Sequence, residues 1–107
     1  MGELAEEKRR ACELAKKLLQ SNVNYLDCVI ELWKIGNALY GQVWDTEFHI
    51  FGVIESDTDH LPTTKFRELC SKEWQAKSDT EVAECISFYK QKVSDACNEI
   101  LAKHGNA

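Results

Sequence analysis

The chain has 107 residues, a formal net charge of −5 and a sequence pI near 5.2. This length suits one domain, residues 1–107, with a single modest core, and an apolar content of 44% excludes a largely disordered chain. The acidic balance argues against nucleic acid as a direct partner, because phosphate binding needs clustered Lys and Arg.

Cysteine usage and the start of the chain favour a cytoplasmic protein. The count of five cysteines is odd, and no two of them form a CxxC pair, whereas disulfide frameworks have even numbers. Glu3, Glu6 and Glu7 stand where a signal peptide would carry positive charge. No apolar run approaches the ~20 residues of a membrane span, so we expect no membrane association.

Two long helices are predicted in the first forty residues. Residues 3–20 are rich in Ala, Leu, Glu and Lys and place their apolar residues at helical spacing. Asn24 is a suitable N-cap for a second helix over 25–40, which Gly41 is expected to end. This second helix is apolar on more than one side, so we expect it to be central.

Residues 45–62, DTEFHIFGVIESDTDHLP, contain an ambiguous element. Phe48, Phe51 and Ile54 recur every three residues, as in a short helix that Asp45 or Thr46 would cap. A strand over 48–54 would instead alternate its apolar residues. We prefer the helix because no second strand is evident, and a lone strand leaves its backbone groups unpaired.

Two further helices complete the prediction. The first runs from a cap at Thr63 or Thr64 to about Gln75. The second runs over 79–103, starts at the capping-box pattern of Ser78 and Glu81, and ends in Lys103, His104 and Gly105, which suit a helix C-terminus. The predicted fold is therefore all-α, a compact bundle of about five helices.

The net charge of the chain is concentrated in residues 45–62. All 13 Lys and Arg lie outside this stretch, where they balance the other acidic residues. Its apolar residues are expected to anchor it to the core while its acids face outward. The charged residues of the stretch, apart from histidine, are Asp45, Glu47, Glu55, Asp57 and Asp59.

Metal binding is one interpretation of these acids. Glu55, Asp57, Asp59 and His60, with His49 as an additional ligand, resemble the start of a calcium loop, in which alternate side chains face the ion. The glycine and terminal Glu of that loop are missing, and no HxxxH or ExxH spacing suits zinc or iron. We therefore predict no metal and no cofactor, and a solvated turn is the plainer alternative.

Catalysis by a cysteine is a second interpretation. A nucleophilic thiol needs an accessible, electropositive setting, but the cysteines occupy apolar helical positions that suit core residues. No GxSxG, Gly-rich phosphate loop or HExxH motif is present. The sequence therefore predicts a binding protein and not an enzyme. The five cysteines are Cys12, Cys28, Cys70, Cys85 and Cys97.

A protein-binding surface is the interpretation we favour. Trp44 directly precedes the acidic stretch, and an aromatic ring rimmed by acids is typical of interface hot spots. The alternative for Trp44 is that it covers the core. The predicted partner-binding residues are Trp44, Asp45, Glu47, Glu55, Asp57, Asp59 and His60.

In size, acidity and layout the chain resembles the small cytosolic immunity proteins of bacterial toxin–immunity pairs, of the contact-dependent inhibition or colicin type. The run IESDTDHLP, after DTEFHIF and before a Trp-bearing helix, resembles a pattern that recurs in small bacterial proteins. This resemblance implies inhibition of a basic toxin, often a nuclease, at its active site or a neighbouring exosite. It covers the type of chain and identifies no contact residue.

Our leading hypothesis is a cytoplasmic protein that neutralises a basic toxin domain through its acidic surface. A metal-binding protein or metal-dependent enzyme using the ESDTDH segment is one alternative. A helical adaptor that self-associates through its broad apolar second helix is another.

Overall fold

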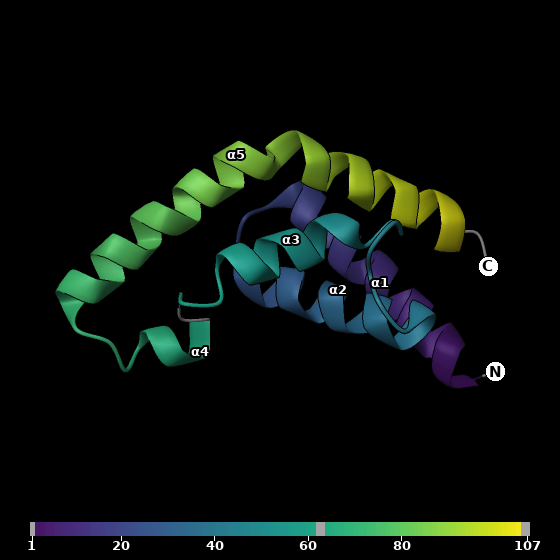
Figure 1. Ribbon diagram of the computed structural model, residues 1–107, viewed down its shortest axis with the longest axis horizontal. Coiled ribbons are helices and arrows are strands. Elements are labelled where there is room, and N and C mark those ends of the chain that lie inside the picture. Colours follow the sequence, from purple (N-terminus) through teal and green to yellow (C-terminus); the bar gives the residue numbers. More distant parts are fainter. Residues whose placement is uncertain (1, 62–63, 106–107) are drawn as a thin grey trace.

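The computed structural model describes residues 2–61 and 64–105, and no strand occurs within them. The all-α prediction is therefore confirmed (Figure 1). Helix is also confirmed over strand for the ambiguous element, because residues 49–54 lie within α3. The helices are α1 (Gly2–Gln20), α2 (Tyr25–Tyr40), α3 (His49–Asp57), α4 (Thr64–Arg67) and α5 (Lys72–His104).

The predicted count of about five helices is slightly high, because α4 is a single turn of four residues beside four longer helices. The predicted boundary near 75–79 is wrong, since α5 continues through it. Ser71 is the true N-cap, and its Oγ accepts a hydrogen bond from the Trp74 N–H at 3.2 Å. Gln75, Ala76 and Lys77 are good helix formers, so nothing in the intervening segment interrupts the helix before Ser78.

Two other predicted helix ends are also wrong: the helix expected to run to about Gln75 ends at Arg67, and the N-cap of α3 is Phe48 and not Asp45 or Thr46. The ends of α2 follow the sequence signals more closely. Gly41 ends α2 with a φ of 79°, and its N–H donates to the Asn37 carbonyl at 2.8 Å. Asn24 precedes α2 as predicted, but it does so in a left-handed conformation and its side chain makes no capping hydrogen bond. The predicted cap at Thr63 or Thr64 lies outside the residues whose side chains are described.

The core lies between α1, α2, α3 and the second half of α5. The helix α1 packs against α2 and α5, and α3 packs against the same two helices. Figure 1 shows α5 arching over the others, with its first half extending past them above α4. The molecule measures 45 × 26 × 23 Å.

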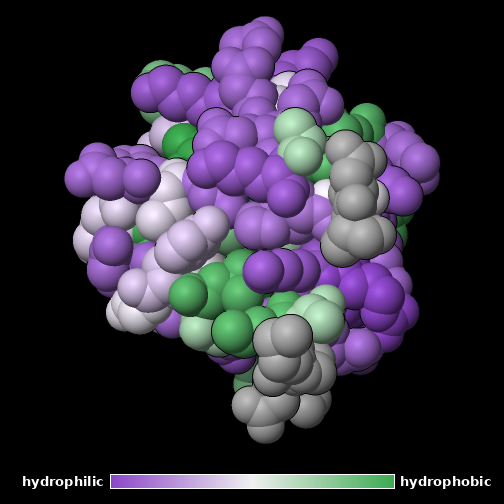
Figure 2. Space-filling model, turned by 90° about the vertical axis from the view of Figure 1, so that its right-hand side faces the viewer, coloured by the Kyte–Doolittle hydropathy of each residue, from purple (hydrophilic) through white to green (hydrophobic). Residues whose placement is uncertain are grey.

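The projecting first half of α5 differs from its second half in burial. Large apolar residues of α5 are buried only from Tyr89 onward, whereas Val82 and Ile86 are half-buried. At the other end of the molecule, where α1 begins and α5 ends, hydrophilic residues cover most of the visible surface (Figure 2). No helix in residues 2–61 and 64–105 combines the length and apolar content required to cross a membrane.

The helix α2 is central, as its broad apolar pattern predicted. Most of its apolar side chains are buried, whereas Ile30, Trp33 and Leu39 are half-buried and Tyr40 is 44% exposed. The buried residues of α2 are Tyr25, Leu26, Cys28, Val29, Leu32, Ile35 and Gly36.

Glycine permits the close approach of α2 and the segment leading into α3. A Cβ atom at Gly36 would lie 2.7 Å from the Cβ of Phe48, and one at Gly52 would lie 2.7 Å from a methyl carbon of Val43. Phe48, Phe51 and Ile54 are all fully buried, which confirms that they anchor the acidic stretch.

Candidate functional site

Glu47 is a buried structural carboxylate, with only 1% of its side chain exposed. The Tyr40 hydroxyl donates to its Oε2 at 2.7 Å, and the His104 Nε2 lies 2.6 Å from the same oxygen. Lys103 Nζ lies 3.4 Å from Oε1. The expectation that Glu47 faces a partner is therefore wrong, because its oxygens are already bound by its own chain.

The surroundings of Glu47 keep it ionised. Burial alone would raise the pKa of this carboxyl group, but hydrogen bonds from Tyr40 and His104, together with the charge of Lys103, hold the pKa below its usual value. The His104 ring also stacks on Phe48, with centroids 6.3 Å apart. These contacts fasten the end of α5 to the segment before α3. The sequence places Lys103 and His104 at a helix end but cannot reveal a partner so distant in the chain.

Trp44 and Asp45 are exposed, as predicted, in the segment that precedes the start of α3 at His49. Half of Trp44 is accessible, and its ring meets the His49 ring edge-on with centroids 5.1 Å apart. Asp45 has a φ of 61°, and its N–H donates to His49 Nδ1 at 3.1 Å. Because α3 has nine residues and so spans about 13 Å, these residues are not brought next to the acids at its other end.

A turn at residues 58–61, which we call the His60 turn, directly follows α3, whose last residue is Asp57, and contains Asp59. Thr58 is buried, and its hydroxyl donates to the Ile54 carbonyl at 2.7 Å. The Leu61 N–H donates to the Thr58 carbonyl at 2.9 Å. Asp57 and Asp59 are exposed beside this turn, so here the acids do face outward as expected.

The first half of α5 faces the His60 turn. His60 Nε2 lies 2.9 Å from Oε2 of Glu81. The Tyr89 hydroxyl donates to Asp57, and this hydrogen bond, together with burial, raises the pKa of Tyr89 to about 12. Two side-chain contacts therefore connect the turn to the long helix.

Sequence reasoning missed the contribution of α5 to this site. Glu81 and Glu84 lie well beyond the acidic stretch and have the composition of an ordinary solvated helix face. Phe88 carried the one available signal, because it is a large apolar residue that falls outside the apolar stripe of its helix. Phe88 is 79% exposed in the structure.

Two clefts adjoin the His60 turn. The Phe88 cleft, of about 380 Å³, lies between the turn and α5, and its lining includes Asp57, His60, Glu81, Glu84, Phe88 and Tyr89. The Trp74 cleft, of about 360 Å³, has a lining that includes Ile30, Glu55, Asp59, His60, Phe66 and Trp74. The turn itself lines both. Among the described lining residues the two clefts contain five carboxylates and no Lys or Arg.

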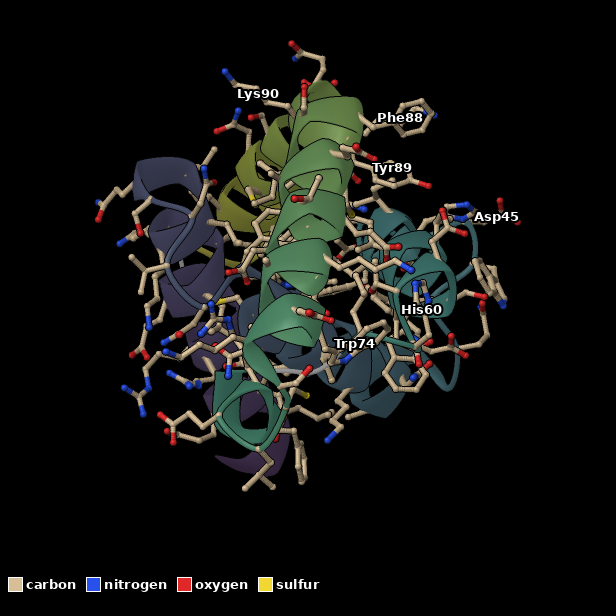
Figure 3. All side chains as sticks on the ribbon, turned by 90° about the vertical axis from the view of Figure 1, so that its left-hand side faces the viewer. Asp45, His60, Trp74, Phe88, Tyr89 and Lys90 are labelled. Atoms are coloured by element: carbon tan, nitrogen blue, oxygen red, sulfur yellow. The ribbon has the colours of Figure 1, made fainter. Side chains whose placement is uncertain are left out.

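The side chains around the turn share one side of α5. In Figure 3, Phe88 and Tyr89 project toward the side on which His60 and Asp45 lie, whereas Lys90 projects to the other side. A cation lies close to the Trp74 cleft, because Lys77 Nζ is 5.8 Å from the centre of the Trp74 ring. The Phe88 cleft is therefore the more uniformly acidic of the two.

The metal interpretation gains no support from this geometry. In the part of the chain that the structure describes, no three His, Cys, Asp or Glu side chains converge as metal ligands would. The carboxylates of the ESDTDH segment instead spread around the turn and into two different clefts.

Four of the cysteines have thiols that remain protonated near neutral pH. Burial is the main cause that raises the pKa of each one, to about 12 for Cys97. A protonated, sheltered thiol is a poor nucleophile, so these residues serve as core or near-core side chains. The four are Cys12, Cys28, Cys85 and Cys97.

No family model matches the chain, and neither a curated protein nor a solved structure matches it. The function therefore has to be inferred from the site itself.

Proposed function

We propose that the protein is a cytoplasmic binding protein that neutralises a basic toxin domain, as the immunity partner of a bacterial toxin. One observation supports this proposal above the others: five carboxylates line two adjoining clefts whose described lining contains no Lys or Arg. A surface of one charge sign attracts a partner of the opposite sign and suppresses wrong partners. The proposed role needs no metal, cofactor or catalytic group.

The contact surface that we propose differs from the sequence-based set. It keeps Glu55, Asp57, Asp59 and His60 around the His60 turn and adds residues of α5. Glu47 is removed because it is buried. Trp44 and Asp45, at the far end of α3, would lie at the margin of such an interface. The residues added from α5 are Glu81, Glu84 and Phe88.

Salt dependence of association tests the proposal. The test begins by asking whether a toxin domain is encoded directly upstream of the gene, since its absence there would count against the proposal. Such a domain is then mixed with this protein in a stopped-flow instrument. Electrostatic steering predicts an association rate constant of about 10⁸–10⁹ M⁻¹s⁻¹ at low salt, which falls toward about 10⁵–10⁷ as salt is raised. A rate constant that is indifferent to salt would contradict the proposal.

A matched pair of variants localises the effect. Glu81→Gln with Glu84→Gln should slow association and flatten its salt dependence. Glu7→Gln with Glu13→Gln makes the same change in net charge on α1, which contributes to neither cleft, and should leave the rate nearly unchanged. Equal slowing by both pairs would mean that overall charge, and not this surface, governs association.

A further inference from the structure

Phe88 is an exposed apolar ring in acidic surroundings. It is 79% exposed, and its ring meets Tyr89 edge-on, with centroids 4.8 Å apart and planes at 88°. Single exposed apolar residues are common on protein surfaces, so the exposure alone implies nothing. Phe88 differs because it lines a cleft whose opposite wall is the His60 turn.

The Phe88 cleft combines apolar and anionic lining. Leu61, which is 8% exposed, and the half-buried Cys85 add apolar atoms to the lining of the cleft. Asp57, Glu81 and Glu84 add carboxylates to the same lining. The contacts of His60 with Glu81, and of Tyr89 with Asp57, hold the two walls together.

A ligand that carries both apolar and cationic groups satisfies both features best. A purely cationic segment gains at most a cation–π contact with the exposed Phe88 ring, about 0.5–1 kcal/mol, and leaves most of the ring's apolar surface in water. A purely apolar segment would desolvate carboxylates without pairing them, which costs free energy. Apolar anchors that fill a pocket inside a charged rim are, in contrast, the usual composition of an interface hot spot.

We infer that the segment of the partner that docks here carries an aliphatic or aromatic side chain flanked by Lys or Arg. This inference rests on the proposed function and specifies the chemistry of the partner. The apolar side chain packs on Phe88 and Leu61. The flanking cations pair with Asp57, Glu81 and Glu84.

Three short peptides test the inference by NMR titration of the ¹⁵N-labelled protein at millimolar peptide concentration. They are acetyl-Lys-Lys-Phe-Lys-Lys-amide, the same peptide with Gly in place of Phe, and acetyl-Glu-Glu-Phe-Glu-Glu-amide. The first peptide should shift the amide signals of His60, Glu84, Phe88 and Tyr89. It should bind about fivefold more tightly than the glycine peptide, because its Phe ring adds an aromatic contact with Phe88. The glutamate peptide should not bind.

Two variants supply the control. Phe88→Ala should reduce binding of the phenylalanine peptide to the level of the glycine peptide, and the high exposure of this side chain means that the fold is kept. Val23→Ala removes another exposed apolar side chain, 63% accessible, away from the cleft, and should change nothing.

The outcomes separate this inference from the proposed function. Equal affinity for the phenylalanine and glycine peptides, or no binding of either, would overturn the apolar anchor while the salt dependence of toxin association decides the proposed function independently. Signal shifts spread over acids elsewhere on the molecule would also overturn it.

Discussion

Glu47 and Asp57 belong to the same acidic stretch, yet the fold treats them in opposite ways. Glu47 is enclosed by Tyr40, Lys103 and His104 and is ionised as part of the structure. Asp57 is exposed and helps to line a cleft with other carboxylates. The contrast teaches that a local excess of acidic residues does not indicate which of them are available to a partner.

Replacing Glu47 should have the largest effect of the changes considered. Glu47→Ala leaves the partly exposed Tyr40 hydroxyl and the largely buried His104 ring without their acceptor, and losing these contacts should lower the free energy of unfolding by about 3 kcal/mol. Urea denaturation measures the change. Asp59→Ala, in the same stretch, should change stability by less than about 0.5 kcal/mol. Similar losses in the two variants would remove the distinction between structural and surface acids.

Acid should reproduce the loss of Glu47. Its pKa in the folded state lies below the ordinary value of 4.5, so its contribution to stability is complete above that value. The contribution is lost as the pH falls through the folded pKa. Glu47→Gln should therefore show a flatter dependence of stability on pH below about 4.5. Stability is followed by circular dichroism. Parallel curves of stability against pH for the variant and the natural protein would exclude Glu47 as the source of the acid-dependent loss.

The position of Glu47 depends on the close approach of α2, at Gly36, to Phe48. Gly36→Ala would force a methyl group against Phe48, the residue after Glu47, and overpacking of this kind should cost about 2 kcal/mol. An alanine in an open helix is normally favourable, so a stabilised variant would show that α2 and α3 do not approach as described. Thermal unfolding of the two proteins provides the comparison.

Tyr89 tests how far Asp57 is itself structural. Tyr89→Phe removes the hydrogen bond to Asp57 and should lower the free energy of unfolding by about 1 kcal/mol. The pKa near 12 would vanish from the tyrosine titration observed by ultraviolet absorbance. A loss as large as that of Glu47→Ala would place Asp57 among the structural acids.

Glu84 should show the smallest effect on stability. Glu84→Gln alters an exposed residue with room around it, so the free energy of unfolding should change by less than about 0.5 kcal/mol. Its consequence is expected in association kinetics instead. A clear loss of stability, measured in urea, would mean that Glu84 holds the fold and is not free for a partner.

Much of the fold could be predicted because helical signals are local. Apolar residues at helical spacing predicted α1 and α2 close to their observed bounds. Gly41 marked the end of α2 because glycine readily adopts a positive φ. The capping-box pattern at Ser78 failed for a related reason. Such a pattern favours a helix start only where the preceding residues do not already continue a helix.

The candidate site was predicted in part. The His60 turn and its acids lie together in the chain, so their grouping was visible. Phe88, Glu81 and Glu84 reach the same place only because α5 packs against α3, and no local pattern encodes that approach. Trp44 was predicted beside these acids because it is close to them in the chain, but a helix separates them in space.

By itself the sequence determined that the chain is helical, where α1 and α2 lie, and that Phe48, Phe51 and Ile54 attach the acidic stretch to the core, because hydrophobic periodicity is a property of neighbouring residues. Only the tertiary structure decided which acids are buried and which are exposed to solvent. Burial and pairing of a carboxylate depend on groups from distant parts of the chain, as the contacts of Glu47 with Lys103 and His104 show. Those distant groups make Glu47 part of the framework and leave Asp57 at the edge of a cleft.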